Sequence, residues 1–317
     1  MTTTIDGTAD SVGPSADGTE TVGTSAADIE FHYDFGNDFY ALWLDETLSY
    51  SAAVWDGIDP AEPDTSALPR AQRAKLDLHL DLAGAAPGTG LRLLDVGCGW
   101  GGLLAHAVRT GRAAEATGLT LSRAQHAHVR SLGLPGADVR LESWDAHRPE
   151  RPYDGIVSVG AFEHFATADM DAAARLAAYR AYFERCHGWL RPGARMSLQT
   201  IAYDGVTGGD GPVGAFVAAE VFPGAVLPRL GEIVLASDPY FAVTLVRASA
   251  EDYARTLGAW SARLLRARAE AERLVGPDGY RRYRRYLRAC EVTFLRGAAT
   301  LYRIGFRRRD EPLRPTG

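Results

Sequence analysis

An α/β domain built on a mostly parallel sheet is the fold class that the sequence predicts. Five apolar runs of strand length alternate with helical stretches across residues 91–201, and this alternation is typical of a parallel sheet with helices on both faces. Two later apolar runs, 240–246 and 300–306, would complete the sheet. A glycine cluster at 97–102 directly follows the first run, which indicates a tight turn between a strand and a helix.

The elements are expected in the following order. Residues 1–28 have almost no large apolar side chain, so we expect a disordered tail. Residues 29–88 are expected to form an N-terminal helical cap with a helix around Leu68 to Leu82, and the sheet domain spans 89–317. Strands are predicted at 91–96, 115–119, 138–142, 154–159 and 194–201, and helices at 101–110, 122–132, 169–190 and 248–274. The Gly- and Pro-rich insertion 202–235 and the helices over 248–298, broken at 276–279, are expected to form a lid.

Composition narrows the class of protein. The 317 residues are 46% hydrophobic, enough for one full core, and no apolar run approaches the ~20 residues that cross a bilayer. Three widely spaced cysteines suggest neither disulfides nor a metal site, so a cytoplasmic protein without a metal is expected. Lys75 is the single lysine among 34 basic residues, which we interpret as the codon bias of a GC-rich bacterial genome.

Positive charge gathers late in the chain. Residues 245–317 contain 17 arginines and 8 acidic residues, a balance of +9. This pattern fits solvated helix faces, and it also fits a basic surface that meets a membrane or an acidic acyl carrier. Aromatic residues are not interleaved with the basic ones as in nucleic-acid-binding proteins, so nucleic acid is not an expected partner.

The glycine cluster carries the first functional signal. Its spacing is Gly-x-Gly-x-Gly, which differs from the dinucleotide fingerprint, and no Lys-Ser or Lys-Thr pair follows as in a phosphate loop. A glycine turn without phosphate chemistry suits a nucleoside with a small charged tail. S-adenosylmethionine (SAM) fits that description, although an ordinary tight turn would use the same glycines.

Two further segments end at the same edge of the predicted sheet. After the second strand, Thr120 and Gln125 could hold the hydroxyl groups of a ribose, while Ser122 is equally suited to cap the next helix. After the third strand, Trp144 could stack on adenine and Asp145 could accept from its amino group. The alternative for this segment is a surface turn with a buried tryptophan.

The segment after the fourth strand is the strongest candidate for chemistry. Glu163 and His164 lie between Phe162 and Phe165, at the carboxyl end of a buried strand. Charged groups are seldom buried without partners, so packing explains this pair poorly. We therefore predict that Glu163 and His164 are catalytic.

Two aromatic segments before the sheet domain complete a recognisable set, at 32–40 (HYDFGNDFY) and 48–55 (LSYSAAVW). Together with the glycine loop, the GLTLS segment followed by Gln125, and GAFEHF at 160–165, they resemble the cyclopropane fatty-acid synthase and mycolic-acid cyclopropane synthase family of SAM-dependent methyltransferases. The VFPG segment at 221–224 and the Tyr, Tyr-Leu, Cys pattern at 283–290 also match, so the resemblance runs from about residue 30 to 308.

The resemblance implies a Rossmann-like sheet of seven strands, the last antiparallel, with a C-terminal helical lid. It implies an alkene substrate whose attack on the SAM methyl leaves a carbocation, which aromatic rings and Glu163 would stabilise. The residues that would hold SAM are Tyr50, Ser51, Gly97, Gly99, Thr120, Gln125, Trp144 and Asp145.

Two positions depart from the family pattern. The family's base is a bicarbonate held by Cys, Glu, His and Tyr side chains and a backbone amide. Ala52 stands at the Cys position and Gln199 at the His position, whereas Glu163 and Tyr253 match. Because alanine donates no hydrogen bond and glutamine carries no charge, we expect bicarbonate not to bind.

The expected function is SAM-dependent methylation of an alkene carbon in a lipid, isoprenoid or polyketide-like molecule. Catalysis is assigned to Glu163, His164, Tyr253 and Gln199. Cyclopropane synthesis on an unsaturated fatty acyl chain and N-methylation of a small amine are alternatives. A SAM-fold protein that binds a ligand without transferring methyl is the rival from another class.

Overall fold

The computed structural model describes residues 35–204 and 226–313. The expected disordered tail, the HYD part of the first aromatic segment, the VFPG segment and most of the insertion 202–235 lie outside these residues. Within the described helices, none combines the length and the apolar character needed to cross a membrane.

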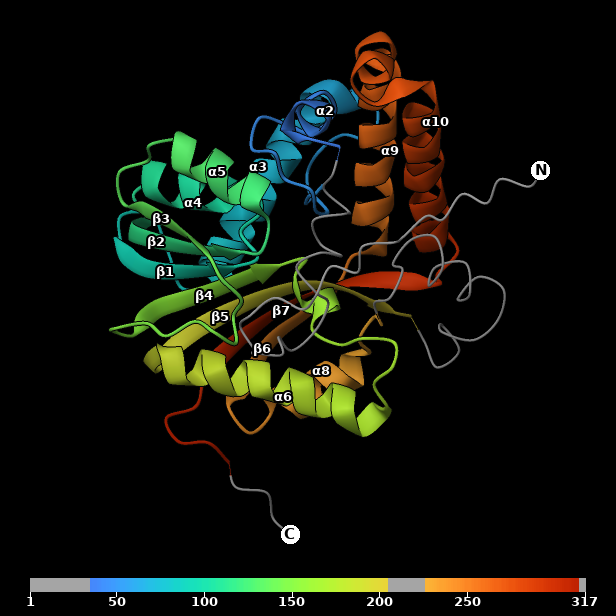
Figure 1. Ribbon diagram of the computed structural model, residues 1–317. Coiled ribbons are helices and arrows are strands. Elements are labelled where there is room, and N and C mark those ends of the chain that lie inside the picture. The colour runs from blue at the N-terminus through green and yellow to red at the C-terminus, as the bar shows by residue number, and fades with distance from the viewer. Residues whose placement is uncertain (1–34, 205–225, 314–317) are drawn as a thin grey trace, which may run out of the picture.

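A seven-stranded sheet forms the centre of the molecule, in the order β3-β2-β1-β4-β5-β7-β6 (Figure 1). The strands are β1 (Leu91–Val96), β2 (Ala113–Thr120), β3 (Ala137–Leu141), β4 (Tyr153–Val159), β5 (Leu190–Tyr203), β6 (Phe241–Ala248) and β7 (Ala299–Arg308). The first five pair in parallel, and β7 runs antiparallel to both β5 and β6. The predicted fold class, with only the last strand antiparallel, is therefore confirmed.

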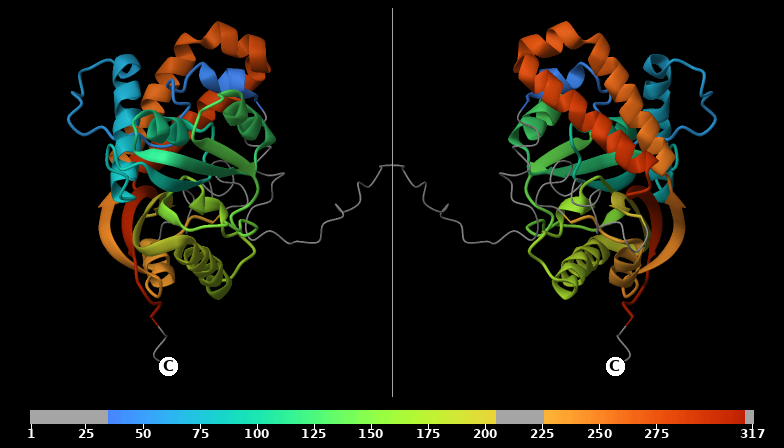
Figure 2. Two further views of the ribbon diagram at one scale, coloured as in Figure 1. Left: turned by 90° about the vertical axis from the view of Figure 1, so that its left-hand side faces the viewer. Right: turned by 90° about the vertical axis from the view of Figure 1, so that its right-hand side faces the viewer.

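Helices cover both faces of this sheet, as the alternating pattern predicts. Figures 1 and 2 show α3 (Asp64–Leu82), α4 (Gly102–Arg109) and α5 (Arg123–Ser131) on one face, with α6 (Ala172–Trp189) and α8 (Leu230–Ser237) on the other. The short elements α2 (Asn37–Ala41) and η1 (Phe162–His164) precede α3 and follow β4, respectively.

The predicted helix 248–274 is wrong in its bounds. The structure has two helices there, α9 (Ala250–Arg266) and α10 (Arg268–Leu295), because the backbone leaves helical geometry at Ala267 (φ −86°, ψ 14°). The predicted break at 276–279 is a kink inside α10, where Gly276 has a φ of 72°. A left-handed glycine ends one helical stretch, and Pro277 can start the next because the first helical position needs no backbone donor.

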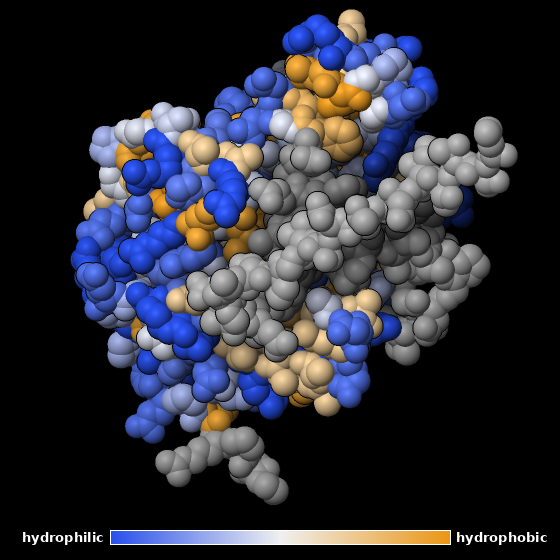
Figure 3. Space-filling model, in the orientation of Figure 1, coloured by the Kyte–Doolittle hydropathy of each residue, from blue (hydrophilic) through white to orange (hydrophobic). Residues whose placement is uncertain are grey.

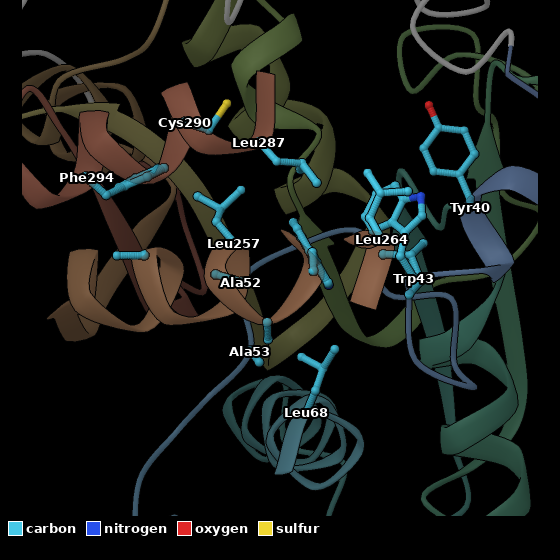
Figure 4. Packing of buried hydrophobic residues seen from close by; sticks show 14 of the residues in the cluster. Tyr40, Trp43, Ala52, Ala53, Leu68, Leu257, Leu264, Leu287, Cys290 and Phe294 are labelled. Carbon is cyan, nitrogen blue, oxygen red and sulfur yellow. The ribbon is translucent and has the colours of Figure 1, made fainter. Parts of the chain in front are cut away.

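An aromatic and apolar cluster is packed between α2 with the loop that follows it, α3, α9 and α10. Tyr40 and Trp43 belong to it together with Leu68 of α3, Leu264 of α9 and Leu287 of α10 (Figure 4).

The sheet reverses its strand order at β1, which has β2 on one side and β4 on the other. Such a reversal leaves a crevice outside the carboxyl ends of the strands, where ligands bind in open α/β sheets.

Candidate functional site

A pocket opens at this switch point, outside the carboxyl ends of β1, β2 and β4. Its wall combines the glycine loop with a loop that follows α2. Of the residues predicted from sequence to hold SAM or act in catalysis, the lining includes Tyr50, Ser51, Gly97, Gly99, Thr120, Gln125, Trp144 and His164. Asp145, Glu163, Gln199 and Tyr253 are not among the lining residues.

The two glycines of the loop serve different purposes. Gly97 has a φ of 83°, and a Cβ there would lie 2.5 Å from the Cβ of Ala161, so the loop can approach η1 only with glycine at this position. Gly99 also has a positive φ, of 54°, but a Cβ there meets nothing within 4 Å. The space in front of Gly99 is thus open to a ligand, whereas Gly97 is required by packing.

The segment after β2 forms its own hydrogen bonds. The Thr120 hydroxyl donates to Oε1 of Gln125 at 2.8 Å. The backbone N–H of Gln125 donates to the Ser122 hydroxyl at 3.3 Å, so Ser122 caps α5 as the sequence allowed. Because Oε1 of Gln125 is already engaged, the side chain would meet a ligand through its NH₂ group.

Trp144 serves both the core and the pocket. The side chain is buried, and its ring lies 5.3 Å from the rings of Phe165 and Tyr182, centroid to centroid. It also lines the pocket, so part of the indole is within reach of a ligand. Asp145 follows it directly in the chain, beyond the residues of the pocket wall.

Glu163 is buried beside the pocket, with 2% of its surface exposed. Oε1 accepts a hydrogen bond from the Ile201 amide at 2.6 Å, and Oε2 has no hydrogen-bond partner within the described chain. Burial raises the pKa of this carboxyl to about 7, against the effect of the Ile201 hydrogen bond. An acid that is half ionised near neutral pH can stabilise a cation and can also take up a proton.

Gln199 lies in a buried polar network behind the pocket. Its Oε1 accepts from the Arg303 Nε at 2.9 Å and lies 3.1 Å from Nε2 of His79. The other ring nitrogen of His79 is 2.8 Å from the Ser197 hydroxyl. Burial lowers the pKa of His79 to about 3, so the imidazole is neutral. We assign its proton to Nε2, because this nitrogen faces an oxygen that can only accept.

Arg303 ties this network to the loop that carries Ala52. The guanidinium is fully buried and pairs with the Asp252 carboxylate of α9 at 2.6 Å. Another of its nitrogens donates to the carbonyl oxygens of Ala53 at 2.7 Å and Ala52 at 3.4 Å. Its charge and donors are therefore used within the protein, and Ala52 contributes only backbone here.

Aromatic rings surround the side of the pocket formed by Tyr50. The Tyr50 ring lies 5.3 to 5.6 Å from the rings of Tyr40, Trp43 and Trp260, and its hydroxyl is 2.6 Å from that of Tyr283. Burial raises the pKa of Tyr50, so the phenol stays protonated.

Tyr253 belongs to α9 and packs apart from the pocket wall. Its ring lies 4.5 Å from that of Phe294. It is also 6.3 Å from Trp260, which contacts Tyr50. The structure thus connects Tyr253 to the pocket through the aromatic cluster.

Three charged lining residues were missed as site residues in the sequence. Lys75 comes from α3, Asp95 is the residue before the last of β1, and Glu142 follows β3. Burial raises the pKa of Asp95 to about 7 and lowers that of Lys75 to about 8. The signals were present, because Asp95 is an acid near a strand end and Lys75 is the chain's single lysine.

Comparison with known proteins identifies relatives over most of the chain. The family model of mycolic acid cyclopropane synthetase matches residues 21–304. Cyclopropane mycolic acid synthase 2 of Mycobacterium leprae is 35% identical over 285 residues, which covers 84% of this chain and 88% of the relative. The structure is also similar to that of the cyclopropane synthase MmaA2 from Mycobacterium tuberculosis, with a TM-score of 0.78, 31% identity, and coverage of 91% of this chain and 100% of that one. Mycolic acid cyclopropane synthase CmaA1, solved with S-adenosylhomocysteine (SAH) and CTAB, has a TM-score of 0.76 at 32% identity and covers 90% of this chain and 99% of its own.

Proposed function

Because the chain belongs to the mycolic acid cyclopropane synthetase family and is a SAM-dependent methyltransferase, we propose that it methylates an alkene carbon of a lipid, isoprenoid or polyketide-like substrate. The observation that carries this proposal is Glu163, a buried carboxyl beside the pocket with one oxygen unengaged within the described chain. Such a group is expected where a cation forms in an apolar site.

The pocket residues fit SAM. The open space at Gly99 admits a ligand close to the backbone, and Trp144 offers an indole face to adenine. Thr120 and Gln125 would hold the ribose hydroxyls, and Tyr50 and Ser51 would border the methionine part. Asp145 would accept from the adenine amino group at the edge of the pocket. When bound, SAM supplies an electrophilic methyl group.

The protein's part in the reaction is to stabilise charge and to remove a proton. Methyl transfer to an alkene leaves a carbocation on the substrate. Tyr50 presents a neutral ring to the pocket, and the faces of such rings attract a cation through their quadrupoles. The ionised form of Glu163 adds a negative charge nearby. We assign the departing proton to His164, directly or through water, because this imidazole lines the pocket. Tyr253, which the sequence also assigns to catalysis, lies outside the lining.

Bicarbonate does not fit the residues that would have to hold it. Ala52 has no side-chain donor, and Oε1 of Gln199 is engaged by Arg303 and faces His79. The nearby cation of Arg303 is paired with Asp252. An anion buried here would lack the charged donors that offset its loss of water. We therefore propose a methylated alkene as the main product, with cyclopropane formation and N-methylation as the alternatives.

A direct experiment tests the proposal. The purified protein is incubated with SAM and lipid or metabolite extracts of the host, and SAH release is measured. We expect release with an extract from a strain that lacks the gene, where the substrate accumulates. Comparison of the two strains by mass spectrometry then identifies the product, and its NMR spectrum separates a methyl branch from a cyclopropane or an N-methyl group. No SAH release with any extract would support the non-catalytic rival.

The helices α9 and α10, within the expected lid 248–298, are proposed to cover the substrate and to meet an anionic surface. Arg282 and Arg285 are exposed on α10, and the exposed Arg296 directly follows Leu295, the last residue of the helix, which is 63% exposed. Figure 3 shows hydrophilic residues next to a hydrophobic patch at the top of the molecule, where α9 and α10 meet. Sedimentation with anionic and neutral vesicles tests membrane binding, and binding to neither would rule out a membrane and leave an acyl carrier or a solvated helix face as the explanation.

A cytoplasmic location is proposed as well. Cys98, Cys186 and Cys290 are all buried and free of disulfides, as is usual for proteins in reducing compartments.

A further inference from the structure

Lys75 is unusual both as a residue type in this chain and in its buried position. It is the single lysine among 34 basic residues, and the other basic residues are all arginine. Its side chain is only 2% exposed, although lysine is almost never fully buried without a partner. It lines the pocket from α3 and is the one lysine or arginine among the lining residues.

The surroundings of Lys75 hold it in place without engaging all its donors. Nζ donates to the Ser51 hydroxyl at 3.0 Å, its single hydrogen bond within the described chain. Gln72, nearly one helical turn earlier, donates to the Ser51 carbonyl oxygen at 3.0 Å. Ser51 is thus fixed at its hydroxyl and its carbonyl. An ammonium has three donors, so two remain for a ligand.

We propose that Lys75, with the Ser51 hydroxyl, binds the carboxylate of the methionine part of SAM. This inference rests on the proposed assignment of the pocket to SAM. SAM carries one anionic group, the carboxylate, and two cationic groups, the sulfonium and the ammonium. The lining offers one lysine or arginine and two acids, Asp95 and Glu142, so the charges of the pocket are complementary to those of the ligand.

The charged groups around Lys75 set its dependence on pH. Asp45, in the loop after α2, and Asp95, near the end of β1, favour the ammonium, whereas Arg303 on β7 opposes it. Burial is the largest influence and lowers the pKa of Lys75 to about 8. A bound carboxylate would favour the charged form. Above about pH 8, SAM binding should therefore be accompanied by proton uptake at Lys75.

The test compares SAM with decarboxylated SAM, which keeps both cationic groups and the adenosine. We expect the unmodified protein to prefer SAM by roughly 10- to 150-fold, the range for a hydrogen bond to a charged group. Lys75→Met should reduce that preference to less than about threefold, while its affinity for decarboxylated SAM stays within a few-fold. Arg73→Gln is the matched control, because it removes a positive charge from the exposed side of the same helix and should keep the preference.

A second measurement uses only the unmodified protein, so this test does not require that Lys75→Met folds. Calorimetry of SAM binding at about pH 8.5, in buffers of different ionisation enthalpy, should show uptake of a fraction of a proton that decarboxylated SAM lacks. Equal affinity for the two ligands, equal proton uptake, or a preference that survives Lys75→Met would overturn the role of Lys75 and leave SAM binding intact. Failure of the unmodified protein to bind SAM at all would instead refute the proposed function.

Discussion

Replacement of Glu163 by glutamine separates the catalytic and structural roles of the buried carboxyl. Glutamine keeps the size of the side chain and an oxygen for the Ile201 amide, which donates to Oε1 at 2.6 Å. The variant loses the negative charge. We expect turnover to fall by roughly 10²-fold or more, because the substrate cation loses a nearby negative charge. SAM affinity should hardly change, since Glu163 is assigned to the substrate cation and not to a group of SAM.

The same variant should change the pH dependence of stability. Burial raises the pKa of Glu163 from 4.5 to about 7, so the folded protein holds this proton more tightly than the unfolded chain. The contribution to the free energy of unfolding is complete below about pH 4 and is lost as the pH rises through about 7. A shift of roughly 2.5 units corresponds to about 3 kcal/mol, of which about 2 kcal/mol falls between pH 5.5 and 8.5.

Urea unfolding at these two pH values measures the effect. The stability of the unmodified protein relative to Glu163→Gln should fall by about 2 kcal/mol from the lower to the higher pH. Asp95, whose pKa is also raised to about 7, titrates in both proteins and cancels in the difference. Glu184→Gln, on the exposed side of α6, is the control and should show no such change. If the difference in unfolding free energy between the two proteins does not vary with pH, the raised pKa of Glu163 is refuted. Near-normal turnover of the variant would show that another group stabilises the cation.

Three further predictions concern the pocket and the base. Gly99→Val should abolish SAM binding in calorimetry while circular dichroism shows a retained fold, because its side chain enters space that the protein leaves open; unchanged affinity would remove the loop from the SAM site. Asp145→Ala should weaken SAM binding by roughly 1.5–3 kcal/mol, and a change below about twofold would place the adenine amino group elsewhere. Stripping bicarbonate from the buffer should leave activity unchanged, whereas the double variant Ala52→Cys, Gln199→His should gain bicarbonate dependence; activity of the unmodified protein that requires bicarbonate would refute this assignment.

The strands could be predicted because each is an apolar run between turn residues, and β1 was predicted with its observed bounds. The division of α9 from α10 could not. Ala267 stands between Arg266 and Arg268, and neither Gly nor Pro marks the turn. The two helices pack against each other and share the aromatic cluster, so tertiary contacts decide where the first one ends.

The pocket could be predicted where its residues end strands, because a parallel sheet brings these ends to one edge. Lys75 and Arg303 were missed because neither residue stands at the end of a strand. Lys75 lies within a helix, and Arg303 within a strand among the 17 arginines of the C-terminal region. Only the folded chain pairs Arg303 with Asp252 or sets Lys75 against Ser51, at separations of 51 and 24 residues.

The fate of a labelled methyl group tests the central claim most directly. The host is grown on methionine with a trideuterated methyl group, and the product that depends on this gene is examined by mass spectrometry and NMR. Methylation of the alkene carbon without ring closure predicts that the product retains all three deuterium atoms in a methyl group bonded to carbon. A product with two deuterium atoms in a cyclopropane ring, or with the methyl group on nitrogen, would contradict the account.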